Sequence, residues 1–240
     1  MAGNGKRILP AGTRVAVTGG TSGLGLALVR VMLERRARIA FVARHREGVE
    51  RVTRDYPGAH GVVGDVSRKD EIHLIALQIL GGLGGLDVLI NNASDPGPLP
   101  LALLADTEDD DFERAFATNV AGPFLLTRTL LGALASSARE GRGSVVLNVS
   151  SDAAQNAYAR WGAYGASKAA LHQLSRIWEA ELANEGIRFL SLDPGDMDTP
   201  LHAAVVPDAD ASVLKRPEMA ACELVDAITL AFPHSTVPAE

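Results

Sequence analysis

The chain has 240 residues, 47% of them apolar, which is enough to bury one sizeable core within a single domain. Its formal net charge of -6 argues against a general nucleic-acid or anionic-membrane binder, whose affinity would depend on a basic face, so neither partner is expected. Because Cys222 is the only cysteine, an intrachain disulfide and a cysteine-rich zinc site are excluded; no metal site is predicted, and Cys222 is interpreted as buried filler in a helix.

The N-terminal segment is polar and glycine-rich up to residue 7, and residues 1–13 are predicted to form a flexible tail without an apolar stretch of signal-peptide length. The longest apolar region, residues 72–90, is interrupted by several glycines and by Asp87, which argues against a membrane-spanning helix. A cytoplasmic protein is therefore expected.

From Arg14 onward, short β-branched apolar runs alternate with longer segments of helical period. Strands apolar on both faces and joined by helices imply a parallel sheet covered on both sides, so residues 14–240 are predicted to form a single Rossmann-type, doubly wound α/β domain. The predicted strands are 14–18, 38–42, 60–64, 86–90, 144–149 and 187–192. The predicted helices are 24–36, 47–55, 67–80, a pair within 107–138 that meets near Gly122-Pro123, and 162–184.

The least regular stretch is residues 193–217, which is rich in Pro, Asp and Ala and follows the last predicted strand. In this fold class, ligands bind at the carboxyl ends of the strands. Residues 193–217 are therefore a candidate lid over a substrate.

A glycine-rich turn, Thr18-Gly19-Gly20-Thr21-Ser22-Gly23-Leu24-Gly25, follows the first predicted strand and opens into a helix. Glycines let a pyrophosphate approach the backbone, and the helix N-terminus offers N–H groups and a positive dipole end. A plain tight turn is the alternative, but the order strand, turn, helix favours dinucleotide binding.

Tyr164 and Lys168 are four residues apart, so on a helix both side chains leave the same face. A fixed positive charge beside a phenol favours the phenolate, which makes Tyr164 a candidate acid/base. Taken alone, a surface tyrosine beside a solvated lysine is the commoner interpretation.

Both motifs, in this order, resemble those of the short-chain dehydrogenase/reductase family, over about residues 14–200. Other family motifs have matches along the chain: Asp65-Val66, Asn91-Asn92-Ala93-Ser94, Asn119, Ser150-Ser151, Pro194-Gly195 and Thr199. The family's catalytic Ser usually lies thirteen positions before the Tyr, which selects Ser151 over Ser150.

The resemblance implies a catalytic tetrad. Tyr164 would protonate a carbonyl oxygen or, in reverse, deprotonate an alcohol, and Lys168 would lower its pKa and bind the nicotinamide ribose. Ser151 would polarise the substrate oxygen, and Asn119 would anchor a water that links Lys168 to solvent. A helix-capping role for Ser151 and a local backbone contact for Asn119 are the structural alternatives.

The resemblance also implies a nicotinamide cofactor, and NADP(H) is favoured over NAD(H), which is not excluded. Ala43 stands where NAD-preferring relatives carry Asp, and Arg44 follows where NADP-preferring relatives often carry Arg, whose guanidinium matches a phosphate. Alternatively, Arg44 and Arg46 are solvated and stack on the adenine without selecting. The expected cofactor contacts are Gly19, Thr21, Ser22, Gly23, Leu24, Gly25, Arg44, Asp65, Val66, Asn92, Ala93, Tyr164, Lys168, Pro194, Gly195, Met197 and Thr199.

Two features depart from the family pattern. Ser94 stands where the family usually has Gly and adds a hydroxyl near the cofactor, as in pteridine-reducing relatives. The closing residues 232–240 lack the usual Val-Asp-Gly-Gly, so a seventh strand is expected to be very short or missing. A homodimer through the helical faces at 119–134 and 164–178 remains expected, and a homotetramer remains possible.

The candidate substrate pocket comprises residues 95–99, 152–161 and 197–206, with Tyr158 and Trp161 available to stack on a ring. The function expected is an NADP(H)-dependent oxidoreductase that transfers hydride to or from a carbonyl/alcohol carbon of a small organic substrate. The alternatives are a C=N or C=C reductase of pteridine or enoyl type, and a non-catalytic NADP(H)-binding redox sensor.

Overall fold

The apolar runs of the sequence assemble into one parallel sheet in the computed structural model, which describes residues 8–232. Within these residues the sheet has six strands in the order β3-β2-β1-β4-β5-β6. The strands are β1 (Arg14–Thr18), β2 (Arg38–Ala43), β3 (Ala59–Val63), β4 (Val88–Asn91), β5 (Ser144–Val149) and β6 (Ile187–Leu192). The predicted doubly wound α/β fold in one domain is confirmed, and the strand order reverses direction between β1 and β4.

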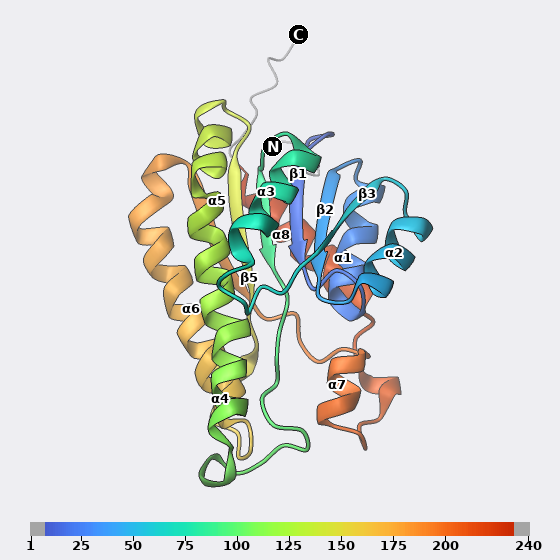
Figure 1. The fold of residues 1–240 in the computed structure, drawn as a ribbon, viewed down its shortest axis with the longest axis vertical. Helices are drawn as coiled ribbons and strands as arrows, with labels where there is room; N and C mark the ends of the chain where they lie inside the picture. Colours follow the sequence, from blue (N-terminus) through green and yellow to red (C-terminus); the bar gives the residue numbers. More distant parts are fainter. Residues whose placement is uncertain (1–7, 233–240) are drawn as a thin grey trace, which may run out of the picture.

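Helices cover both faces of the sheet (Figure 1). They are α1 (Gly23–Glu34), α2 (Arg46–Asp55), α3 (Ile72–Leu83), α4 (Asp109–Phe116), α5 (Gly122–Arg139), α6 (Gly162–Leu182), α7 (Pro200–Val205) and α8 (Pro217–Ala231). Because side chains alternate across a strand, Val15 and Val17 pack under α1, α2 and α8, whereas Ala16 packs under α3 and α5. The sheet therefore separates two hydrophobic cores.

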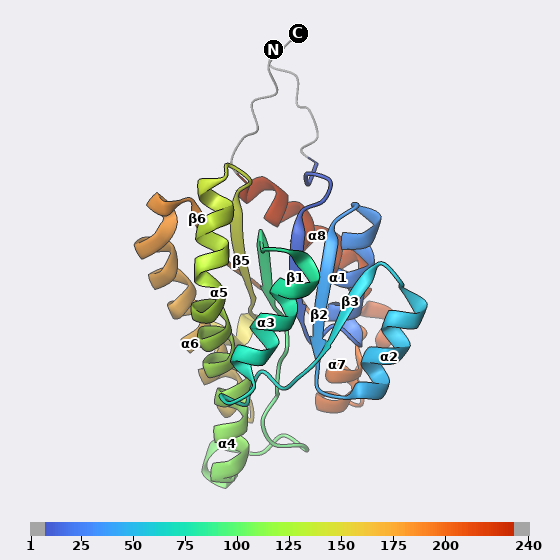
Figure 2. The same cartoon turned by 45° about the horizontal axis from the view of Figure 1, so that its top comes forward.

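The carboxyl ends of the strands face the end of the molecule where α4 and α7 lie, as Figures 1 and 2 both show. The pair of helices predicted within 107–138 is present as α4 and α5, joined by a π-helical turn at Ala117–Ala121 rather than by a break. Such turns are frequent at functional sites, and this one holds Asn119.

The third helix begins at Ile72, five residues later than predicted. The carboxylate of Asp65 accepts hydrogen bonds from the backbone N–H and hydroxyl of Ser67, and Glu71 accepts one from the Asp65 N–H. These side-chain hydrogen bonds hold residues 65–71 in turns, so the helix begins later in the sequence.

The candidate lid, residues 193–217, is an ordered segment that contains α7 and a short 3-10 turn, Ala211–Val213. Its two ends are tied together, because Lys215 N–H donates to Asp196 O (3.0 Å) and Asp198 N–H donates to Lys215 O (3.0 Å). The Lys215 ammonium also donates to the carbonyl of Pro194 at 3.0 Å. Residues 193–217 therefore form a loop whose two ends are hydrogen-bonded to each other.

One expectation about exposure needs correction, and one residue of the expected tail is buried. Cys222 lies in a helix, α8, as predicted, but it is exposed, because α8 turns the neighbouring Ala221 toward the sheet and the next residue points away. Leu9, within the expected flexible tail, is only 1% exposed and packs into the core.

The remainder of that tail, residues 1–7, and residues 233–240, where a seventh strand was expected to be very short or missing, lie outside the described residues. No helix among residues 8–232 is both long and apolar enough to cross a membrane.

Candidate functional site

A cleft of about 880 Å³ opens at the carboxyl ends of the strands, where the strand order reverses between β1 and β4. This is where the fold class places its ligands. All the residues expected to bind the cofactor line it: Gly19, Thr21, Ser22, Gly23, Leu24, Gly25, Arg44, Asp65, Val66, Asn92, Ala93, Tyr164, Lys168, Pro194, Gly195, Met197 and Thr199.

The glycine-rich turn at the bottom of the cleft has the geometry of an anion cradle. Gly19 has φ +73°, and a side chain at Gly25 would collide with the carbonyl oxygen of Gly19. The N-cap of α1, Ser22, makes no side-chain capping bond, and the first turn carries no acidic residue. The backbone N–H groups and positive dipole end of α1 therefore fit a pyrophosphate.

A polar clamp joins this turn to the end of β4. The Thr18 hydroxyl oxygen accepts hydrogen bonds from Asn92 N–H and Ala93 N–H, both at 3.0 Å, and the Asn92 amide donates to Thr18 O at 2.8 Å. Thr18 was not among the expected site residues, although a hydroxyl residue directly before the glycine turn was the available signal. The clamp sets the distance between the two walls of the cleft.

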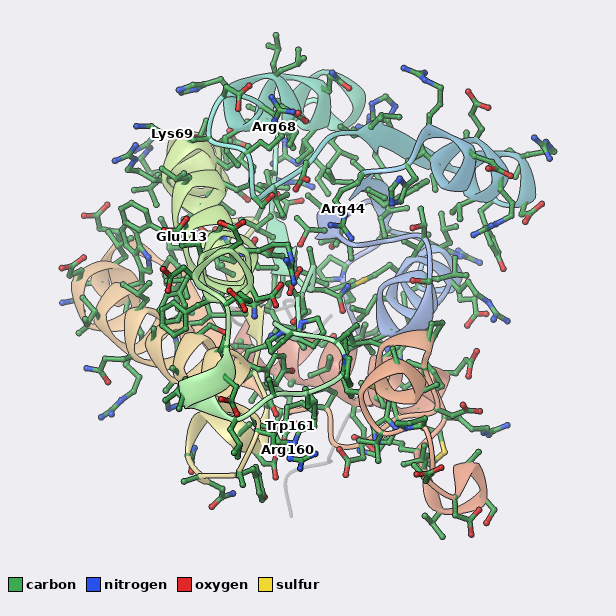
Figure 3. All side chains as sticks on the ribbon, turned by 60° about the horizontal axis from the view of Figure 1, so that its bottom comes forward. Arg44, Arg68, Lys69, Glu113, Arg160 and Trp161 are labelled. Carbon is green, nitrogen blue, oxygen red and sulfur yellow. The ribbon has the colours of Figure 1, made fainter. Side chains whose placement is uncertain are left out.

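The far end of the cleft carries Arg44, exposed at the end of β2, together with Asp65 and Val66 after β3. Figure 3 places Arg44 and Trp161 on opposite sides of the site. One oxygen of the Asp65 carboxylate is taken by Ser67, which fixes its orientation. Arg44 is thus available to a charged group at the end of the cleft remote from Tyr164.

Tyr164 and Lys168 extend from α6 into the cleft, opposite Ser151 at the end of β5. Lys168 is 2% exposed, and its ammonium donates to Val149 O at 2.8 Å and lies 5.4 Å from the centre of the Tyr164 ring. Trp161 packs edge-on against that ring, with 5.4 Å between centroids. The Tyr164 ring is thus in contact with both the Trp161 ring and the Lys168 ammonium.

Burial raises the pKa of Tyr164 to about 12. Hydrogen bonds from Ser151 and Ser94 lower it, whereas the negative charges of Asp193 and Asp152 raise it. The direction is opposite to the lowering expected from Lys168, because desolvation and two carboxylates outweigh the hydrogen bonds from Ser151 and Ser94. Tyr164 is therefore a neutral phenol near pH 7, the form that donates a proton.

Burial also lowers the pKa of Lys168 to about 8, although Asp193 counteracts this. Desolvation disfavours the ammonium more strongly than one exposed carboxylate favours it. Lys168 thus remains mainly charged at pH 7, and the hydrogen bond to the Val149 carbonyl holds its ammonium in position.

Asn119 does not line the cleft; it is 0% exposed behind the wall. Its amide oxygen accepts from Asp95 N–H (2.8 Å) and from the Ser94 hydroxyl (3.2 Å), and its NH2 group donates to Asp95 O (2.8 Å) and Ser167 (2.9 Å). These four contacts occupy both ends of the side-chain amide. A water relay at this residue would therefore need its backbone rather than its side chain.

The three expected substrate segments contribute unevenly to the cleft. Pro96, Tyr158 and Trp161 line it, whereas Leu99 points into solvent at 52% exposure. The Tyr158 hydroxyl donates to Asp152 at 2.6 Å. Residues that line the cleft outside the expected contacts, substrate segments and lid include Val42, His45, Gly64, Thr118 and Val149.

Comparisons with known proteins agree with this geometry. The family model described as short chain dehydrogenase matches residues 13–210. An uncharacterised oxidoreductase of Mycobacterium bovis is 34% identical over 224 residues, which cover 90% of this chain and 64% of that protein. The chain thus spans under two thirds of that relative's length. The 2-(R)-hydroxypropyl-CoM dehydrogenase of Xanthobacter autotrophicus is 32% identical over 79% of this chain and 76% of its own.

Two solved structures are similar over nearly the whole chain. The 3-ketoacyl-(acyl-carrier-protein) reductase of Brucella melitensis, complexed with NADH, has a TM-score of 0.84 at 27% identity, covering 95% of this chain and 93% of its own. A variant of the actinorhodin polyketide ketoreductase with NADPH has a TM-score of 0.81 at 26% identity, covering 90% of each chain.

Proposed function

Because this chain belongs to the short chain dehydrogenase family, we propose that it transfers hydride between NADP(H) and a carbonyl or alcohol carbon of a small organic substrate. The observation that carries the proposal is the position of the Tyr164 phenol, in contact with Ser151 and above the buried Lys168, in the cleft that begins at the glycine turn. When bound, the nicotinamide supplies the hydride.

In the reducing direction, Tyr164 donates its proton to the carbonyl oxygen as the carbon is reduced. Ser151, whose hydroxyl oxygen also accepts from Ala153 N–H at 3.2 Å, donates to the same substrate oxygen. Lys168, held by Val149 O, places a positive charge near the phenolate that remains. The raised pKa of Tyr164 supports proton donation, and hence reduction, at neutral pH.

The preference for NADP(H) rests on Arg44. Its guanidinium is exposed at the cleft, and no ion-pair partner within residues 8–232 competes for it. A guanidinium pairs with a phosphate in bidentate fashion, and Ala43 places no carboxylate before it that would repel one. The NADH and NADPH complexes of the two structural relatives show that the fold accommodates either cofactor.

Arg44→Asp is therefore expected to weaken NADPH binding by about 10- to 100-fold, the value of a charge-assisted contact, while NADH binding changes little. Fluorescence titration with each cofactor measures both constants. Arg46→Asp is the matched control, since Arg46 is also exposed but does not line the cleft. Equal losses for NADPH and NADH in the Arg44 variant would show that Arg44 does not select the cofactor.

The test of the reaction itself is NADPH oxidation with a panel of aldehydes, ketones, pterins and enones. Turnover of aldehydes or ketones is the expected result. Turnover of pterins or enones alone would favour C=N or C=C reduction. Tight NADPH binding without turnover of any compound would favour a redox sensor.

We also propose that two copies pair through the outer faces of α5 and α6. Phe124 on α5 and Trp178 on α6 stack with 6.1 Å between ring centroids, and Ile177 beside them is 42% exposed. These faces carry apolar groups that a second copy would cover.

A further inference from the structure

Ser94 connects two members of the catalytic tetrad that do not touch each other directly. Its hydroxyl donates to the amide oxygen of Asn119 at 3.2 Å, and Ser94 also acts on the Tyr164 phenol, whose pKa it lowers. It lines the cleft directly after β4.

We propose that Ser94 is an additional catalytic hydroxyl, which turns from Asn119 to the phenolate oxygen of Tyr164 when Tyr164 gives its proton to the substrate. This role rests on the proposed function. The Tyr164 proton moves to the substrate oxygen as hydride reaches the carbonyl carbon, and Ser94 keeps its own proton throughout. Solvent then reprotonates the phenolate.

The contacts of Asn119 keep the free-energy cost of this rotation of the Ser94 hydroxyl low. A serine hydroxyl has one proton to donate, so it can serve either Asn119 or Tyr164 at a given moment. When it turns to Tyr164, the Asn119 oxygen still accepts from Asp95 N–H at 2.8 Å. The rotation therefore leaves no buried acceptor unpaired. An unpaired buried acceptor would oppose it.

Ser151 also lowers the pKa of Tyr164, but during the proposed reaction it is engaged with the substrate. Its hydroxyl contacts Asp152 at 3.2 Å, and in the proposed reaction its single proton is directed to the substrate oxygen. The charged groups that act on Tyr164 are Lys168 on its own helix, Asp152 after β5 and Asp193 after β6. Both carboxylates disfavour the phenolate. A hydroxyl that donates to the phenolate oxygen alone would therefore stabilise it.

Ser94→Ala and Ser94→Gly test the proposal through the pH profile of carbonyl reduction. Loss of a donor to the phenolate raises the pKa of Tyr164, and reduction needs the neutral phenol. In protein labelled with fluorotyrosine, whose phenol is more acidic, the decline of reduction at high pH falls in the measurable range and should move upward by about one pH unit. The plateau kcat should fall about tenfold, because the phenolate formed during proton transfer is less stabilised.

Ser167→Ala is the matched control. Ser167 accepts from the other end of the Asn119 amide, but it donates to the backbone carbonyl of Tyr164, not to the phenol. Loss of the Ser167 hydroxyl should leave unchanged the pH at which carbonyl reduction declines, even if kcat changes. A decline at the wild-type pH in both Ser94 variants, or an equal shift in the Ser167 variant, would reduce Ser94 to a structural role.

A second measurement does not depend on turnover. The chain has three tyrosines, so 19F NMR of protein labelled with fluorotyrosine, whose phenol is more acidic, resolves Tyr164 once Tyr164→Phe identifies its signal. Ser94→Ala should raise the titration midpoint of that signal, and an unchanged midpoint would overturn the proposal. If no carbonyl in the panel is reduced but the midpoint rises, the proposed function fails while the contact of Ser94 with the phenolate stands.

Discussion

Tyr164→Phe is expected to lower the kcat of carbonyl reduction by about 10²- to 10⁴-fold, the usual contribution of a positioned general acid. The variant keeps the ring that packs against Trp161 and lies beside Lys168, but it has no proton to donate. NADPH affinity and the melting temperature should therefore stay close to those of the wild type. Steady-state kinetics, cofactor titration and thermal unfolding measure the three quantities.

Tyr56→Phe is the matched control for this loss. Tyr56 follows α2 and packs against the core on the side of α1, and it does not line the cleft. Removing its hydroxyl should leave kcat unchanged. A Tyr164 variant that is as active as the Tyr56 variant would mean that another group, or water, protonates the substrate.

Asp87→Asn is expected to lower the free energy of unfolding by about 3 kcal/mol, because it removes the shared anion of a buried cluster. Asp87 is 1% exposed and precedes β4, at the opposite end of the sheet from the cleft. Its carboxylate accepts from Arg14 (2.6 Å), Arg142 (3.0 Å) and Ser137 (2.6 Å). A loss of this size corresponds to a melting temperature about 6 to 12 °C lower in a domain of this length.

The contribution of Asp87 should also depend on pH. Burial alone would raise the pKa of Asp87, but the hydrogen bonds from Arg14, Arg142 and Ser137 outweigh it and hold the pKa well below its usual range. The stabilisation is therefore fully present above the unfolded pKa of about 3.9 and is lost as the pH falls below it. The gap in stability between the wild type and Asp87→Asn should narrow in acid.

Asp226→Asn controls for the loss of any carboxylate near an arginine. Asp226 pairs with Arg35 on the surface at 3.0 Å, and its side chain is 51% exposed. Such exposed pairs contribute about 1 kcal/mol or less. Equal effects in both variants, measured by urea unfolding at pH 7, would contradict a special role for Asp87.

The sheet was largely predictable because its strands are continuous apolar runs. The predicted bounds of β1, β5 and β6 agree with the structure. The start of α3 was not predictable from the same pattern, since the bonds of Asp65 to Ser67 and Glu71 override an apolar helical period. Local side-chain contacts of this kind decide boundaries and leave no periodic signal.

The candidate site was predictable where it depends on spacing and not where it depends on packing. The order of the motifs placed Tyr164 and the glycine turn at one cleft. The direction of the Tyr164 pKa shift could not be inferred, because it depends on burial and on Asp193 and Asp152, which approach from two other strand ends. The contact of Ser94 with Asn119 likewise depends on the conformation of the loop after β4.

The most direct test of the proposed reaction is the fate of the hydride. With NADPH deuterated at the transferring position of the nicotinamide C4 and any aldehyde or ketone of the panel that is reduced, mass spectrometry of the alcohol should find one deuterium on the carbinol carbon. Tyr164→Phe should form this product far more slowly. An alcohol without deuterium, or no alcohol from any carbonyl despite bound NADPH, would contradict the account.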